Sequence, residues 1–98
     1  MADLKISPNI NAFPNDDHTF LHIEIELPGI RKENIHFKLH PDSFYIQATK
    51  EGVEYVGAYS VCCPVIPSEA RAHYEDGLLT VDVPYQDEMA DMVEVQIE

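Results

Sequence analysis

Apolar side chains recur at every second position along most of this chain, and this two-residue period constrains the fold more than any other feature. The segment LHIEIEL (21–27) shows it most clearly. The same alternation recurs at residues 35–40, 44–49, 59–63, 70–74, 79–83 and 93–97. Because successive side chains of a strand point to opposite faces, each segment predicts a strand with one buried face and one wet face. No stretch of helical periodicity competes with this pattern, so the chain is expected to be all-β.

The dipeptide Asp76-Gly77 predicts a tight hairpin between two of these strands. Asp-Gly between alternating runs is the strongest short-range signal for a two-residue β-turn. A turn centred there pairs apolar residues with apolar residues on one face. The expected pairs are Tyr74 with Leu79, Ala72 with Val81, and Ala70 with Val83.

A second break occurs at Pro28-Gly29, within IEIELPGIRKENI (23–35). A simple hairpin at this break would place Glu24 opposite Lys38, an attractive pair. However, a link covering 28–34 is long for a hairpin. It suits a chain that leaves one sheet and crosses to another. Seven or eight short strands then predict an antiparallel two-sheet β-sandwich. We expect one domain over 1–98, with the sandwich at 7–84 and an acidic linker and apolar C-terminal segment at 85–98.

The charge balance limits the classes of partner that the chain can bind. The 98 residues carry a formal net charge of −12, which argues against nucleic acid and against an anionic membrane surface. No apolar run is long enough to span a bilayer, and MADLKISPNI (1–10) has no signal-peptide core. The only cysteines, Cys62 and Cys63, are adjacent and suggest no disulfide framework. We therefore expect a cytoplasmic protein.

Two groups of side chains invite a chemical interpretation. Strand parity predicts Cys63 buried and Cys62 exposed, although neighbouring thiols are also suited to a soft metalloid such as arsenite. His22 and His40 would face each other in the hairpin topology and suit zinc, but the sandwich separates them, and no third ligand is evident. No catalytic motif is present. We expect no enzyme activity, no cofactor and no metal.

Four segments in order resemble the alpha-crystallin domain of small heat-shock proteins. They are SPNINAF (7–13), IEIELPGIRKENI (23–35), FYIQA (44–48) and ARAHYEDGLLTVDVP (70–84). The resemblance implies an immunoglobulin-like sandwich in which the Pro-Gly link crosses between sheets. One sheet would hold strands near 6–13, 20–27, 70–75 and 78–83. The other would hold strands near 34–39, 44–49 and 58–63.

The resemblance also implies a function. It suggests an ATP-independent stress-response chaperone (a holdase) that binds unfolded or partly folded clients and limits their aggregation. The alternative is an interaction module of the co-chaperone CS type that docks one defined partner. Only about six residues precede the resemblance, and TKEGVEYVGA (49–58) is all that is available for the loop that many relatives exchange between subunits. We therefore expect a small assembly, a homodimer or a monomer.

The resemblance further implies an apolar groove between the edge strands near 34–39 and 70–75. Its expected lining is Ile35, Phe37, Leu39, Ala70, Ala72 and Tyr74. In the family this groove receives an apolar tail. Here residues 93–97 alternate again, so Val93, Val95 and Ile97 are expected to form an extended segment packed at a sheet edge.

Overall fold

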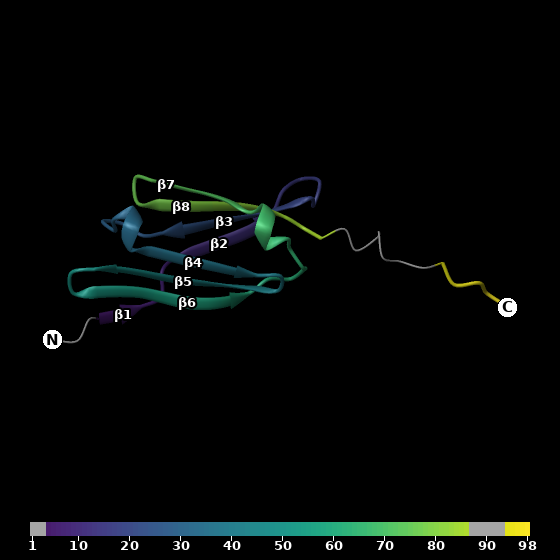
Figure 1. Cartoon of the computed structure of the whole chain (residues 1–98), viewed down its shortest axis with the longest axis horizontal. Helices are drawn as coiled ribbons and strands as arrows, with labels where there is room; N and C mark the ends of the chain where they lie inside the picture. Colours follow the sequence, from purple (N-terminus) through teal and green to yellow (C-terminus); the bar gives the residue numbers. More distant parts are fainter. Residues whose placement is uncertain (1–3, 87–93) are drawn as a thin grey trace.

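The computed structural model describes residues 4–86 and 94–98 and contains two four-stranded sheets packed face to face (Figure 1). One sheet has the order β1 (Leu4–Ile6), β6 (Val53–Ser60), β5 (Ser43–Lys50) and β4 (Ile35–His40). The other has the order β2 (Ile10–Pro14), β3 (Phe20–Glu26), β8 (Leu78–Pro84) and β7 (Arg71–Glu75). Two single 3₁₀ turns, η1 (Lys32–Asn34) and η2 (Pro67–Glu69), precede β4 and β7. No helix among the described residues is long and apolar enough to cross a membrane.

The core lies between the two sheets and uses the inward faces that the alternation predicted. β3, β5 and β8 each contribute every second residue, and the side chains of Ile23, Ile46 and Val81 have no exposed surface. Branched aliphatic side chains suit such a pleated interior. The full set of buried apolar residues is Leu21, Ile23, Ile25, Leu27, Ile30, Phe44, Ile46, Ala48, Val65, Leu79, Val81 and Val83.

The Pro28-Gly29 break carries the chain from one sheet to the other. Gly29 has φ +78, and the Ile30 amide donates to the Leu27 carbonyl at 3.3 Å. Pro followed by Gly with positive φ is the arrangement of a type II turn. The hairpin alternative is wrong, because the neighbours of β3 are β2 and β8 and that of β4 is β5.

The hairpin at Asp76-Gly77 is confirmed. Both residues have positive φ, +52 and +79, as a type I′ turn requires. Tyr74 pairs with Leu79, and Ala72 pairs with Val81. The third expected pair does not form, because Ala70 follows η2 and β7 begins one residue later.

The first strand of the prediction is two strands. Residues 4–6 pair in parallel with β6, whereas residues 10–14 pair antiparallel with β3 in the other sheet. The buried Pro8 lies between them. Proline cannot donate to a ladder, so the chain changes sheets there. Among the described residues, the first strand of the sandwich is therefore β1.

The third strand of the β4 sheet is displaced from its expected position. β6 covers Val53–Ser60 instead of 58–63, because Glu51-Gly52 forms a two-residue turn with Gly52 at φ +80. The segment expected as a loop is therefore strand. Gly57 concealed this from the sequence, since it interrupts the apolar stripe. The Tyr59 ring covers it, and a Cβ added at Gly57 would lie 2.5 Å from that ring.

The burial predicted for Cys63 is wrong. Both Cys62 and Cys63 are exposed. β6 ends at Ser60, so the strand parity that placed Cys63 inward does not extend to it. The inward position after this strand is filled by Val65, which is fully buried.

Candidate functional site

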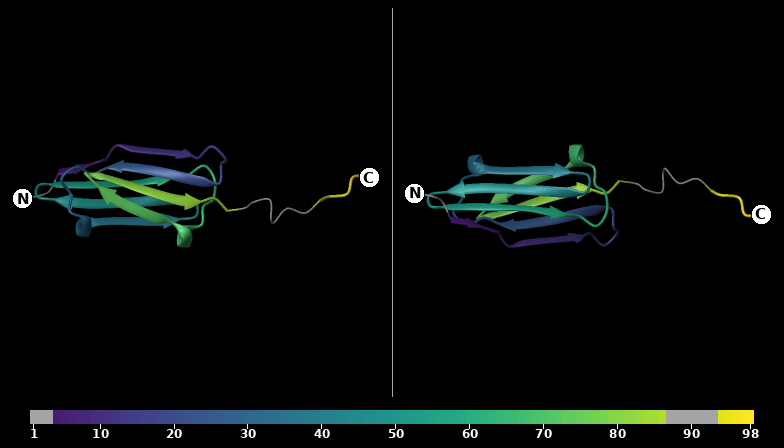
Figure 2. Two further views of the ribbon diagram at one scale, coloured as in Figure 1. Left: turned by 90° about the horizontal axis from the view of Figure 1, so that it is seen from above. Right: turned by 90° about the horizontal axis from the view of Figure 1, so that it is seen from below.

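Strands β4 and β7 form the last members of the two sheets, and each has one edge that no other strand of the described chain covers. Figure 2 shows both strands on the same side of the sandwich, together with the short turns η1 and η2. Such edges present unpaired backbone N–H and C=O groups. The two edges are the candidate binding site.

The structure brings the predicted lining residues to these two edges but buries them unequally. Ile35, Phe37 and Leu39 are half-buried against the core, as is Ala70. Ala72 is exposed. Two shallow clefts include residues of the site: one of about 550 Å³ includes Ala70, and one of about 330 Å³ includes Leu39. Apolar surface is therefore accessible beside unpaired backbone.

Tyr74 has a structural role besides its predicted place in the groove lining. Its hydroxyl lies 2.8 Å from the Leu27 carbonyl and 2.7 Å from the Ile30 carbonyl, so one proton is shared between the two acceptors. Burial raises the pKa of Tyr74, which keeps the hydroxyl a donor. Tyr74 thus fixes the crossover turn to β7 and holds the two sheets together beside the candidate site.

The tail residues Val95 and Ile97 are exposed by 79% and 93%. Residues 94–98 contain no strand. Val93 lies outside the described residues. Packing of this segment on an edge of its own sandwich is thus not observed for Val95 and Ile97, and packing on a second chain stays a prediction.

The histidines are distributed as the sandwich interpretation predicted. His22 Nδ1 lies 2.7 Å from Asp82 Oδ1 on the adjacent strand, and its Nε2 lies 3.4 Å from Glu24. The hydrogen bond to Asp82 raises the pKa of His22, although burial opposes this shift. His40 instead contacts Asp42 at 2.6 Å. No cluster of three or more His, Cys, Asp or Glu side chains in residues 4–86 and 94–98 is arranged to hold a metal ion.

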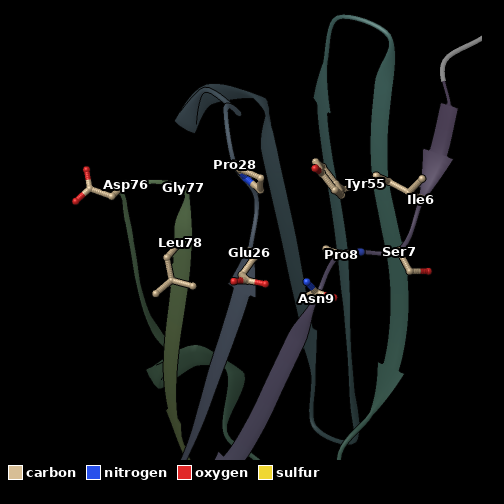
Figure 3. A pocket seen from close by; sticks show the side chains of 10 residues that line it. All are labelled: Ile6, Ser7, Pro8, Asn9, Glu26, Pro28, Tyr55, Asp76, Gly77 and Leu78. Carbon is tan, nitrogen blue, oxygen red and sulfur yellow. The ribbon is translucent and has the colours of Figure 1, made fainter.

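A further cleft of about 500 Å³ was not predicted from the sequence. Figure 3 shows Glu26 and Leu78 on neighbouring strands of one sheet, and Tyr55 and Ile6 on the other. The breaks in the strands at Pro8 and Pro28 open the space between the two sheets. In the sequence, only these two breaks could have indicated this cleft. Its lining includes the carboxylate of Glu26, but Asp76 points away from it in Figure 3. We assign no chemistry to this cleft.

Solved structures show which fold this is. Heat shock protein 16.0 from Schizosaccharomyces pombe superposes with a TM-score of 0.76 and 18% identity, covering 96% of this chain and 77% of that one. A small heat-shock protein from Xylella fastidiosa gives 0.70 and 12%, covering 95% of both chains. HSP18.5 from E. histolytica gives 0.70 and 16%, covering 94% and 99%. The fold is that of the alpha-crystallin domain.

The alpha-crystallin fold expected from the four sequence segments is thereby confirmed. No protein-family profile matches the chain, and no curated protein matches it in sequence. At these low identities the likeness lies in the backbone. In this alpha-crystallin sandwich, β4 and β7 are the strands between which the sequence placed the groove.

Proposed function

We propose that this chain is an ATP-independent holdase that binds partly unfolded proteins and limits their aggregation. One observation carries the proposal: β4 and β7 have edges that no other strand of the described chain covers, beside half-buried apolar side chains on one side of the sandwich. Aggregation-prone clients expose the complementary features, which are apolar side chains and unpaired strands. The small heat-shock neighbours in fold support a chaperone role.

The binding mode is strand addition. An extended client segment pairs with β4 through the backbone, and its alternate side chains contact Ile35, Phe37 and Leu39. Each of these is already partly buried, so the further burial of one contributes less than the ~1.5–3 kcal/mol of a fully buried aliphatic or Phe side chain. Binding is then weak and reversible per site, as release of a client without ATP requires. The net charge of −12 disfavours acidic clients.

A second candidate is an interaction module that docks one defined partner. The tight turn at Glu51-Gly52 favours it, because β5 and β6 leave no long loop there to exchange with a neighbouring subunit. Such a module binds with saturable one-to-one stoichiometry and does not protect unrelated proteins.

Light scattering from several unrelated heated clients distinguishes the two functions. Ala72→Lys introduces a charge at the exposed site edge, while His73→Lys adds a comparable charge on the opposite face of the same strand. We expect the parent chain and His73→Lys to suppress scattering and Ala72→Lys to suppress it less. Equal loss in both variants contradicts binding at this site, and no protection by the parent contradicts the holdase.

A further inference from the structure

The adjacent thiols of Cys62 and Cys63 lie outside the candidate binding site, in the loop between β6 and η2. Their Sγ atoms are 2.9 Å apart, and both residues are exposed. One atom bonded to both sulfurs at about 2.3 Å, the length of a Zn–S bond, spans sulfurs up to about 4.6 Å apart. The two thiols are therefore within chelating range.

The loop that carries them is held on both sides. The Val61 amide donates to the Asp42 carbonyl at 2.9 Å, and the Val65 amide donates to the Pro41 carbonyl at 2.8 Å. Beyond the thiols, the Gln86 side chain donates to the Val65 carbonyl at 3.1 Å, and Val65 itself is fully buried. The fold thus presents the thiols from a fixed segment.

Tyr85 supplies a polar group beside the two sulfurs. Its hydroxyl oxygen is buried and makes no hydrogen bond of ordinary length among the described residues, although a hydrogen-bonding interaction with Cys62 contributes to its raised pKa. Burial raises the pKa of Tyr85, and negative charge on Cys62 and Cys63 raises it further. The hydroxyl therefore keeps its proton and can donate to a sulfur that carries negative charge. A buried donor is costly unless it is used.

We propose that Cys62 and Cys63 form a chelating site for trivalent arsenicals that carry one organic substituent. Each thiol replaces oxygen on arsenic, so two As–S bonds form and the As–O bonding breaks. The two thiol protons leave with the oxygen as water, and no electrons are transferred. The substituent's carbon fills the third position on arsenic, so two protein ligands complete the site.

The composition of the site selects this class over metal ions. Soft thiolate ligands prefer soft centres, but a closed zinc site needs four ligands, and no cluster of three or more His, Cys, Asp or Glu among the described residues is arranged to hold a metal. A disulfide between two adjacent cysteines closes a small ring that contains a planar trans peptide. An arsenic atom inserted between the two sulfurs makes this ring larger. Arsenous acids are also uncharged near neutral pH, so the net charge of −12 does not repel them.

The test uses the reduced full chain and phenylarsine oxide. We expect one phenylarsenic unit per chain by intact mass spectrometry, with loss of both reactive thiols. A dithiol such as 2,3-dimercaptopropanol should remove it, and an excess of a monothiol should not. Removal by a monothiol at the same rate overturns the proposal.

A matched control keeps two thiols on the chain and separates them. Cys63→Ser combined with Ser7→Cys moves one thiol to an exposed position directly after β1, next to Ile6, which pairs with Tyr55. This variant and Cys62→Ser should release phenylarsine oxide to a monothiol. Retention by the control equal to that of the parent contradicts chelation by the adjacent pair.

Two further measurements ask whether the fold contributes. A ligand that prefers the folded chain raises its thermal midpoint, so phenylarsine oxide should raise that of the parent and leave that of Cys62→Ser unchanged. Tyr85→Phe keeps the ring and should weaken retention by about tenfold, as loss of a supporting hydrogen bond does at ligand sites. An unchanged thermal midpoint of the parent, or equal affinity of phenylarsine oxide for the urea-unfolded chain, overturns the inference that the fold builds the site.

Discussion

At the residue scale, the turn residues fix how the two sheets meet. The Gly77 carbonyl accepts a hydrogen bond from the Leu27 amide at 2.7 Å, so the β7–β8 turn is joined to the crossover between sheets. A Cβ at Gly77 would lie 3.1 Å from Pro28 Cα. Gly77 therefore serves both its own turn and its contact with the crossover.

Gly52 is a natural control for Gly77, since its φ of +80 is nearly the same but its Cβ position is open. Both Gly52→Val and Gly77→Val place a branched side chain at positive φ, which costs about 1–3 kcal/mol. Gly77→Val also meets Pro28 and should lose more stability in urea denaturation. Equal losses for the two variants contradict the packing of this turn on the crossover.

Tyr74 makes the second connection to the crossover. Tyr74→Phe removes the donor shared by the Leu27 and Ile30 carbonyls, so we expect a loss of about 1–3 kcal/mol in the free energy of unfolding. Tyr45→Phe is the control, because the Tyr45 hydroxyl makes no hydrogen bond within the described part of the chain. A loss for Tyr74→Phe no greater than that for Tyr45→Phe contradicts this role.

His22 gives the fold a pH dependence. The hydrogen bond to Asp82 raises the folded pKa of His22 above its ordinary value of 6.5. The folded chain then binds this proton more tightly than the unfolded chain does. The resulting stability is fully present below about pH 6.5 and is lost as the pH rises through the raised value. Asp82→Asn should therefore lower stability at pH 5.5 more than at pH 8. A difference that is independent of pH contradicts the pairing.

At the element scale, alternation identified the strands wherever every inward position is apolar. β3, β4, β5 and β8 have this property. The placement of β4 and β7 as the two edges of the candidate site came instead from the resemblance to the alpha-crystallin domain. The exceptions have local causes. Gly57 hid β6, whose inward position is filled by a neighbouring ring. Pro8 divided the first strand. The end of β6 at Ser60 removed the parity on which the position of Cys63 depended.

Contacts between distant segments could not be read from the pattern. The parallel pairing of β1 with β6 and the bonds of Tyr74 to the crossover join residues far apart in the chain. The resemblance placed Tyr74 in the groove lining, and its ring packs against the core. Its hydroxyl is nevertheless committed to Leu27 and Ile30, and periodicity contains no information about such a partner.

The tail is tested as an element by deleting residues 93–98. Val95 and Ile97 are exposed in the single chain, so we expect the deletion to leave the thermal midpoint of the dilute protein unchanged. It should reduce the particle size in light scattering at high concentration, because a tail seated on a second chain joins subunits. A lower midpoint in dilute solution, or no effect on size, contradicts docking between chains.

At the scale of the whole molecule, the sandwich leaves some edges open and covers others. β1 occupies the outer edge of β6, while β4 and β7 each have one edge that no strand of residues 4–86 or 94–98 covers. The net charge of −12 makes copies of the chain repel one another. This repulsion favours a small assembly, and the monomer or dimer expected from the sequence stays a prediction.

Hydrogen–deuterium exchange in the presence of a partly unfolded client tests the central claim, which is client binding by strand addition at β4 and β7. Amides that face outward from these edge strands should exchange more slowly when a client is bound, because they gain backbone partners. Those of β2, an edge strand on the other side of its sheet, should exchange as before. If the client's aggregation is suppressed while β4 and β7 gain no protection, the account of the binding edges is wrong.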